Sequence, residues 1–252
     1  MRRLRTGLLG AGLVGQAAHA FYLWEERERF EFAALADASP AVRKSVGGRY
    51  GVGELHAGLD GLLGCGLEAL VIAAPDAFHP ALAAAALNAG LHVMCEKPLA
   101  LTLAGCDKIA AARDRSGRVL QVAYMKRYDP AYRRALDLLP ARIEEVQLIS
   151  VEVNDPDQGP FVAHLPMTAP DDLPAALKDE TREMTRAQLR EAAGTPLGEA
   201  GARALANGFL SALVHDVAVV HGMLARLGVE MPAEADHGSV FADGYGVQLG
   251  FG

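Results

Sequence analysis

The 252-residue chain has few cysteines, no excess of positive charge and no long uncharged hydrophobic run. Its three cysteines form no CxxC pair, which argues for reduced thiols in a cytosolic protein and against a disulfide framework or a zinc site. The net charge of −7 argues against a nucleic-acid partner, because a duplex binder needs a basic face. Outside the amino terminus no uncharged apolar run reaches about eighteen residues, so no membrane span is expected.

The amino-terminal sequence has the pattern of a secretory signal peptide. Met1–Arg5 is basic, the following residues are mostly apolar, and Ala18–Ala20 has the small-residue spacing of a cleavage site. However, three glycines at dinucleotide-fold spacing lie inside the apolar stretch, and cleavage would remove them. We therefore expect a cytoplasmic protein that keeps this segment. Hydrophobic residues make up 51% and charged residues 22% of the chain, which is ordinary for a soluble globular enzyme.

Residues 1–125 alternate short apolar runs with helical patterns. Helices are expected to begin near Leu13, Ala41, His79 and Leu103. Strand and helix alternating at this spacing predict an α/β domain with a parallel sheet and right-handed crossovers. The expected strands are Leu4–Leu9, Phe32–Ala36, Ala69–Ala73, His92–Cys95 and Val119–Ala123.

Residues 126–252 have a different character and are expected to form a second domain. Asp129 and Pro130 predict a helix start, as N-cap and first helical residue. A proline-rich loop at 155–174 and the helix after it are expected to face a substrate or partner, because loops of this length are usually functional. The other expected elements are a strand at Val146–Asn154, a charged helix at Ala175–Ala193, a buried apolar helix at Phe209–Leu227 and a hairpin at Ser239–Phe251 turning at Asp243-Gly244.

The motif Gly10-Ala11-Gly12-Leu13-Val14-Gly15 follows the first strand directly. Gly10 permits a tight turn, Gly12 lets the backbone approach a pyrophosphate, and Gly15 allows close helix packing. The N–H groups at this helix start, around Leu13 and Val14, would then face the phosphates. These residues predict a dinucleotide site.

Asp37 ends the next strand about twenty residues further on, the spacing of an acid that binds ribose hydroxyls. The alternative is that Asp37 only caps the helix near Pro40. A carboxylate here predicts NAD rather than NADP, because it would repel a 2′-phosphate. Arg43 and Lys44 follow and weaken that preference.

Two later motifs end strands of the same expected sheet. Ala74 and Pro75 precede His79, which is either a cofactor contact or simply the start of a helix with Pro80. Glu96-Lys97-Pro98 follows the next strand, so Lys97 is expected at the carboxyl edge, where open α/β sheets bind ligands. A cationic nicotinamide would lower the pKa of this lysine and suit it to accept a proton from a hydroxyl. We expect a cis peptide before Pro98; alone, the tripeptide fits a surface turn equally well.

His215 lies within the apolar helix, where a histidine satisfied by hydrogen bonds is the ordinary alternative to a site residue. Cysteines and carboxylates show no grouping that suggests a metal site.

Taken together, these residues resemble the glucose–fructose oxidoreductase / inositol dehydrogenase / MocA family. The matching segments are the glycine motif, Asp37, Pro75 with His79, "AGLHVMCEKPLALT" at 89–102, "YMKRYDPAY" at 124–132 and "LVHDVAVVHGML" at 213–224. The resemblance implies an amino-terminal Rossmann domain and a carboxy-terminal α+β domain whose open, mostly antiparallel sheet often mediates homo-oligomerisation.

The resemblance also implies roles. Lys97 and His215 would be catalytic, Glu96 would stand at the cofactor, and Arg127, Asn154 and Ser211 would join them at the substrate. Ser211 departs from the aspartate that many members carry there. The chain ends within an expected strand pair, so part of the second sheet is expected to be absent or trimmed.

The expected activity is hydride transfer between a nicotinamide cofactor and a sugar-like or cyclitol alcohol or ketone. The alternatives are a reductase of a larger carbonyl or conjugated substrate, and a nucleotide-binding regulator that has lost its chemistry.

Overall fold

The computed structural model describes residues 2–151, 159–194, 196–229, 235–240 and 247–251. Six parallel strands form one sheet in the order β3-β2-β1-β4-β5-β6. The order reverses between β1 and β4, and ligands of open α/β sheets bind beside such a reversal at the carboxyl ends of the strands. The strands are β1 (Leu4–Leu9), β2 (Phe30–Ala36), β3 (Glu54–His56), β4 (Ala69–Ile72), β5 (His92–Cys95) and β6 (Leu120–Val122).

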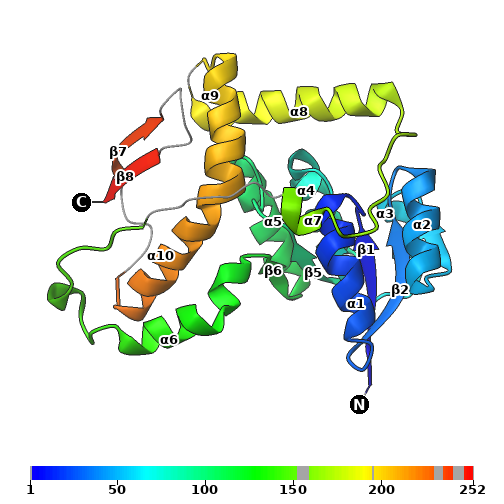
Figure 1. Ribbon diagram of the computed structural model, residues 1–252, viewed down its shortest axis with the longest axis horizontal. Coiled ribbons are helices and arrows are strands. Elements are labelled where there is room, and N and C mark those ends of the chain that lie inside the picture. Colours follow the sequence, from blue (N-terminus) through cyan, green and yellow to red (C-terminus); the bar gives the residue numbers. More distant parts are fainter. Residues whose placement is uncertain (1, 152–158, 195, 230–234, 241–246, 252) are drawn as a thin grey trace. The chain divides into compact units, whose positions relative to one another are not determined.

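Helices connect these strands and pack on both faces of the sheet (Figure 1). Successive strand residues point to opposite faces, so Leu8 and Leu9 belong to different core clusters. The helices are η1 (Gly15–Ala20, a π-helical turn), α1 (Phe21–Glu25), α2 (Pro40–Tyr50), α3 (Leu59–Leu63), η2 (Asp76–Phe78), α4 (His79–Asn88) and α5 (Leu103–Ser116).

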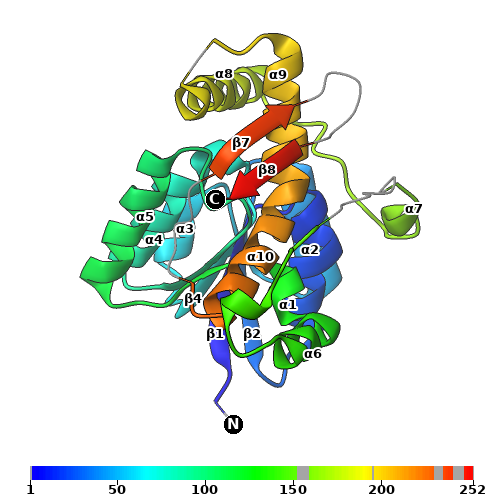
Figure 2. The same cartoon turned by 90° about the vertical axis from the view of Figure 1, so that its left-hand side faces the viewer.

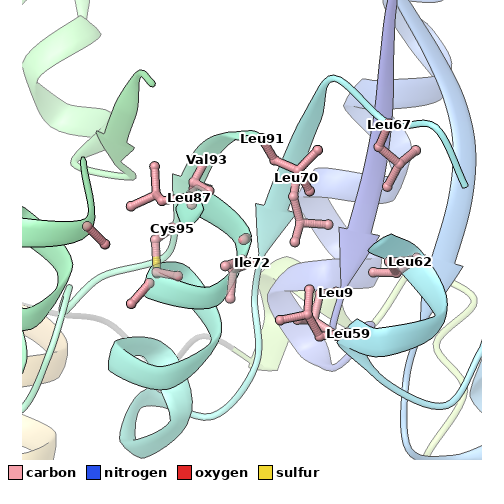
Figure 3. Packing of buried hydrophobic residues seen from close by; sticks show 14 of the residues in the cluster. Leu9, Leu59, Leu62, Leu67, Leu70, Ile72, Leu87, Leu91, Val93 and Cys95 are labelled. Atoms are coloured by element: carbon pink, nitrogen blue, oxygen red, sulfur yellow. The ribbon is translucent and has the colours of Figure 1, made fainter. Parts of the chain in front are cut away.

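Each core cluster combines side chains from one face of the sheet with the helices that cover it. The cluster containing Leu9 includes residues of α3, α4 and α5, and Figure 3 shows Leu87 of α4 beside Val93 and Cys95 of β5. The cluster containing Leu8 includes residues of η1, α1 and α2. These two apolar layers hold the carboxyl ends of the strands in fixed positions beside one another.

The predicted parallel α/β fold is confirmed for this part of the chain, and all five predicted strands are present. β1 and β5 have the predicted bounds, and α4 and α5 begin at His79 and Leu103 as predicted. The edge strand β3 was not predicted, because three residues are too few to establish an alternating pattern.

The chain divides into two compact units, Met1–Ala123 with Asp157–Gln188, and Tyr124–Pro156 with Leu189–Gly252. The expected division into 1–125 and 126–252 places its boundary close to Ala123, where the first segment of the first unit ends, but it treats both domains as continuous in sequence. The observed first unit is discontinuous, because part of the proline-rich loop forms hydrogen bonds with η1 and α2. Thr168 bonds to Gln16, for example, across 152 positions of sequence.

Asp129 caps α6 as predicted: its carboxylate accepts a hydrogen bond from the Ala131 N–H at 2.7 Å, and Pro130 is the first helical residue. The predicted hairpin is also confirmed in its two antiparallel strands (Figure 2), while Asp243 and Gly244 lie outside the described residues. The remaining elements are η3 (Met125–Tyr128), α6 (Pro130–Leu138), η4 (Ile143–Glu145), α7 (Gly159–Val162), α8 (Ala175–Ala193), α9 (Glu199–Arg203), η5 (Ala204–Leu213), α10 (Val214–Arg226), β7 (Ala235–Val240) and β8 (Val247–Phe251).

The strand expected at Val146–Asn154 is wrong for residues 146–151, which are irregular; Asn154 lies outside the described residues. A strand requires a hydrogen-bonding neighbour, and none is present beside this segment in the described part of the chain. Leu148 is accordingly 80% exposed. The expected open, mostly antiparallel sheet is likewise not found among the described residues, where the second unit holds only the β7–β8 pair. Homo-oligomerisation through such a sheet stays a prediction.

The expected apolar helix at Phe209–Leu227 is part of a longer helical run, Glu199–Arg226, whose middle section η5 is π-helical. By length and composition this run could cross a membrane, with a mean hydropathy of 1.5 in its most apolar window; core helices of soluble proteins pass the same test. Only 22% of that window is buried, so the expectation of a buried helix is wrong for the described residues.

Candidate nucleotide and substrate site

The glycine loop after β1 has the geometry that a pyrophosphate cradle needs. Gly10 has a φ of 91°, and a methyl group there would come within 2.5 Å of the main chain following β4. A methyl group on Gly15 would collide with the Gly10 carbonyl oxygen, so only glycine lets the helix start pack this closely on the turn after β1. Around Gly12, by contrast, nothing lies within 4 Å of the added position, and Leu13 and Val14 are exposed. The loop is therefore closed on its protein side and open where phosphates would approach.

Asp37 lies at the end of β2 as predicted and holds the glycine loop. Its carboxylate accepts hydrogen bonds from the Ala11 N–H at 2.7 Å and the Ser39 N–H at 2.8 Å. The N-cap of α2 is Ser39 rather than Asp37, because the Ser39 hydroxyl accepts from the Val42 N–H at 3.0 Å. Arg43 is one of the two cations whose presence argues against a strict preference for NAD over NADP. It donates a hydrogen bond to the Asp37 carbonyl oxygen.

A segment far along the chain borders the same loop, and sequence reasoning missed it. The Gln16 side chain is buried and pairs with Thr168 in both directions, donating to its carbonyl and accepting from its N–H at 3.0 Å each. The Thr168 hydroxyl also lies 2.6 Å from that of Ser45 on α2. No periodic pattern links these positions, so the sequence offered no signal for the pairing.

The same segment brings a second carboxylate to the end of β2. Asp172 accepts hydrogen bonds from the Ser39 hydroxyl and from the Ala41 N–H at the start of α2. These hydrogen bonds, with a smaller contribution from Arg43, hold the pKa of Asp172 below its ordinary value. Two acidic side chains, Asp37 and Asp172, therefore bond to the same short turn.

The Glu96-Lys97-Pro98 motif lies at the carboxyl end of β5, with the cis peptide before Pro98 that the sequence predicted. Glu96 accepts a hydrogen bond from the Lys97 N–H at 3.0 Å, and its other oxygen lies 2.8 Å from Nε2 of His19 on η1. Burial alone would raise the pKa of Glu96, but the His19 contact and the Lys97 N–H and charge lower it overall. Glu96 thus ties the glycine-loop helix to the strand that carries Lys97.

A second acid near Lys97 was not singled out from the sequence. Burial raises the pKa of Asp76, and the charge of Glu96 raises it further, while His79 and Lys97 oppose the shift. Two neighbouring carboxyls therefore have pKa values moved in opposite directions, up for Asp76 and down for Glu96. Such divergence is typical of sites where one group carries a proton and the other stays ionised.

His79 is fully buried and positions this edge of the sheet. Its ring nitrogens lie 2.8 Å from the Pro98 carbonyl oxygen and 2.9 Å from the Ala74 carbonyl oxygen. It also starts α4, as the more ordinary interpretation of the sequence held, with Pro80 in the first turn. His79 therefore connects the turn at Ala74-Pro75 to the lysine motif, and its ring is occupied by main-chain contacts.

Two predicted residues of the second unit, Ser211 and His215, lie on η5 and α10. Ser211 is exposed near the end of η5, and His215 is half-buried at the start of α10. The His215 ring packs edge-to-face against Tyr124, with ring centroids 6.4 Å apart. The next residue, Asp216, is buried and pairs with Lys126 at 2.8 Å; neither of these was predicted.

Arg127, predicted at the substrate, is exposed, and its guanidinium lies against α10 at Gly222, where an added methyl group would be 3.3 Å away. Gly222 is seven residues after His215, roughly 10 Å along a helix. Burial and the charge of Arg127 lower the pKa of His221. Arg127 therefore lies next to Gly222 and within electrostatic reach of His221.

A glycine loop after β1, a carboxylate after β2 and the strand order 3-2-1-4-5-6 together define a dinucleotide-binding Rossmann domain. Residues 4–124 match the sequence model of the Gfo/Idh/MocA oxidoreductases, described as an oxidoreductase family with an NAD-binding Rossmann fold. This part of the chain is therefore similar to that family.

Individual proteins are similar over the same region. Inositol 2-dehydrogenase 1 of Saccharopolyspora erythraea is 39% identical over 140 residues, which are 53% of this chain and 41% of that protein. The WlbA dehydrogenase from Bordetella pertussis, solved in complex with NADH and UDP-GlcNAcA, is 26% identical with a TM-score of 0.51, over 54% of this chain and 42% of that one.

A broader likeness concerns the fold alone. Myo-inositol 2-dehydrogenase from Lactobacillus plantarum has a TM-score of 0.59 at 20% identity, covering 88% of this chain and 56% of that one. The chain spans about two fifths of the length of the curated inositol dehydrogenases that it matches.

Proposed function

We propose that the protein is an NAD-dependent oxidoreductase that transfers a hydride between nicotinamide and a cyclitol or sugar-like alcohol or ketone. The observation that carries the proposal is Lys97: it is half-buried, follows β5 at the sheet edge of the glycine loop, and lies within electrostatic reach of Asp76 and Glu96. The match of residues 4–124 to the family model and the inositol dehydrogenase among the similar proteins support the reaction and the substrate class.

The residues of the first unit fit the cofactor. Gly12 leaves its side of the loop open, main-chain N–H groups begin η1 beside it, and Asp37 and Asp172 disfavour a 2′-phosphate. When bound, NAD supplies the hydride acceptor or donor at C4 of the nicotinamide ring. Glu96 accepts a hydrogen bond from the Lys97 N–H and contacts His19 on η1, and so fixes the Lys97 main chain relative to the helix that follows the glycine loop.

Lys97 takes the proton of the substrate hydroxyl while the adjacent carbon loses its hydride, and returns a proton in the reverse reaction. Asp76, whose pKa is raised, is suited to pass that proton onward. We further propose that His215 assists Lys97 and that Ser211, one helical turn away, hydrogen-bonds near the substrate hydroxyls. Arg127 and Asn154 remain proposed substrate contacts on the strength of the family resemblance.

The test is turnover by the purified protein with a panel of inositols, sugars and larger carbonyl compounds, each with NAD and NADP and their reduced forms. NADH production from a cyclitol or sugar, lost in Lys97→Ala, supports the proposal. Reduction of only the larger carbonyl compounds would instead identify a reductase. Saturable NAD binding without turnover of any compound would contradict the enzyme and favour the nucleotide-binding regulator.

A further inference from the structure

Three donor side chains converge at the outer edge of the sheet, away from the residues assigned to catalysis. The Cys65 sulfur lies 3.1 Å from Nε2 of His56, and that nitrogen lies 3.7 Å from a carboxylate oxygen of Glu54. All three donor atoms lie within 4.8 Å of one another. No sequence motif predicts this group, because the cysteine follows the histidine by nine residues with a helix between them.

Secondary structure explains why the three side chains meet. Glu54 and His56 are two residues apart on β3 and therefore project from the same face of the strand. Cys65 follows α3, the short helix that turns the chain back beside β3. Its N–H donates to the Leu62 carbonyl oxygen at 3.0 Å, which fixes the turn that carries the thiol.

The histidine ring has a defined position. It lies directly over Gly61, where an added methyl group would collide with the ring. The Cys65 sulfur also lies 3.2 Å from the Gly61 carbonyl oxygen, so thiol and ring are packed around one residue. On the other side, the His56 carbonyl oxygen accepts a hydrogen bond from the Asp37 N–H at 3.2 Å, which anchors β3 to the end of β2.

Two of the three donor separations are close to those of a tetrahedral metal site. Zinc–sulfur bonds of about 2.3 Å and zinc–nitrogen or zinc–oxygen bonds of about 2.0–2.2 Å require donor atoms roughly 3.4–3.6 Å apart. The 3.1 Å and 3.7 Å observed here differ from these values by less than the reach of a small side-chain rotation. A thiolate, an imidazole and a carboxylate form a donor set that suits Zn²⁺, and a water molecule would complete the fourth position.

We propose that Glu54, His56 and Cys65 bind one Zn²⁺ ion. The ion would join the edge strand β3 to the turn after α3 and so hold the strand that is hydrogen-bonded to Asp37. The ion would lie away from the proposed reaction site, because Glu54 and His56 are on the edge strand β3 and Cys65 is in the turn after α3, whereas Lys97 follows β5 on the other side of β1 and β4. The competing explanation is a thiol–imidazole hydrogen bond beside an exposed carboxylate.

The experiment uses the whole chain, stripped with a chelator and titrated with Zn²⁺ by calorimetry and with Co²⁺ by absorption. We expect one equivalent to bind, a thiolate-to-cobalt charge-transfer band, and a higher melting temperature with zinc. Cys65→Ser should weaken binding by about 100-fold or more, since even residues that only orient ligands contribute about 10–100-fold.

Two further variants make the result interpretable. Glu54→Gln changes an exposed side chain that the fold does not need, so weaker zinc binding by this variant reports on coordination itself. Cys106→Ser is the matched control, a half-buried thiol outside the cluster, and should bind as the wild type does. Zinc affinity equal in wild type, Cys65→Ser and Glu54→Gln, absence of a thiolate band, or no binding at micromolar zinc would each overturn the proposal.

Discussion

Gln16 and Thr168 form a two-way hydrogen-bonded pair across 152 positions of sequence: the Gln16 amide donates to the Thr168 carbonyl oxygen and accepts from its N–H, at 3.0 Å each. Gln16 directly follows the last glycine of the nucleotide loop and also donates to the Ala11 carbonyl oxygen at 2.7 Å. A single buried side chain therefore joins the glycine loop to the segment that carries Asp172.

Replacing Gln16 by alanine removes all three bonds and leaves the buried Ala11 carbonyl and the partly buried Thr168 main-chain groups without these partners. We expect the free energy of unfolding to fall by about 1–3 kcal/mol, measured by urea denaturation. The segment around Thr168 should also become more sensitive to limited proteolysis. Gln121→Ala, an exposed glutamine on β6, is the control; equal protease sensitivity of both variants would show that the pairing does not hold the segment.

Asp172 is expected to add to the discrimination against NADP. Asp172→Asn keeps an oxygen that can accept from Ala41 but removes the charge, so the ratio of NADPH to NADH dissociation constants should fall by up to about tenfold. Fluorescence titration with the two reduced cofactors measures the ratio. Asp171→Asn, one residue earlier and exposed, should leave it unchanged; tighter binding of NADPH than NADH by the wild type would refute the preference itself.

Lys97→Ala is expected to lower kcat by about 10²–10⁴-fold, the usual contribution of proton transfer, while the NADH dissociation constant stays within a few-fold of wild type. Lys108→Ala, an exposed lysine on α5, is the matched control and should turn over normally. Near wild-type kcat in Lys97→Ala would mean that Lys97 is structural.

Glu96 and Asp76 should give opposite pH dependences of stability. The pKa of Glu96 is lowered in the folded protein, so its stabilisation is present above its ordinary pKa of 4.5 and is lost as the pH falls through the folded value. Glu96→Gln should therefore lower the free energy of unfolding by about 1–3 kcal/mol at pH 7, with the difference shrinking below pH 4.5. Glu28→Gln, an exposed control, should show no such window.

The pKa of Asp76 is raised, so its contribution is most favourable below its ordinary pKa of 3.8 and is lost as the pH rises through the folded value. Asp76→Asn should accordingly raise the free energy of unfolding at neutral pH while slowing turnover. Denaturant unfolding across pH 3–8 checks both signs, and a less stable Asp76→Asn at pH 7 would contradict the assignment.

The proposed cooperation of Lys97 and His215 is open to a double-mutant cycle. If both act on the same substrate hydroxyl, the losses in kcat/KM of Lys97→Ala and His215→Ala should be strongly non-additive in the double variant. His221→Ala, six residues further along the same helical run, is the control and should be additive with Lys97→Ala. Additive losses for His215 would remove it from the catalytic set.

Much of the fold could be predicted from local sequence. The strands β1 and β5, the starts of α4 and α5, and the caps at Asp129 and Pro130 follow from apolar periodicity and residue preferences over a few positions. The glycine motif could also be predicted, because main-chain atoms in and beside the turn leave no room for a side chain at Gly10 or Gly15. The failed strand at Val146–Asn154 shows the limit of this reasoning: strand propensity without a hydrogen-bonding partner produces no strand.

The site beyond those motifs was decided by tertiary structure. The sequence determined that a glycine loop, Asp37 and Lys97 would each end a strand, and a parallel sheet then brings strand ends to one edge. Three contacts at the site form only in the folded chain. Gln16 bonds to Thr168, Asp172 bonds to the turn after β2, and His19 contacts Glu96. Such contacts join residues tens to more than a hundred positions apart. Packing and charge in the folded chain determine which of these residues meet, and local periodicity in the sequence does not predict such pairs.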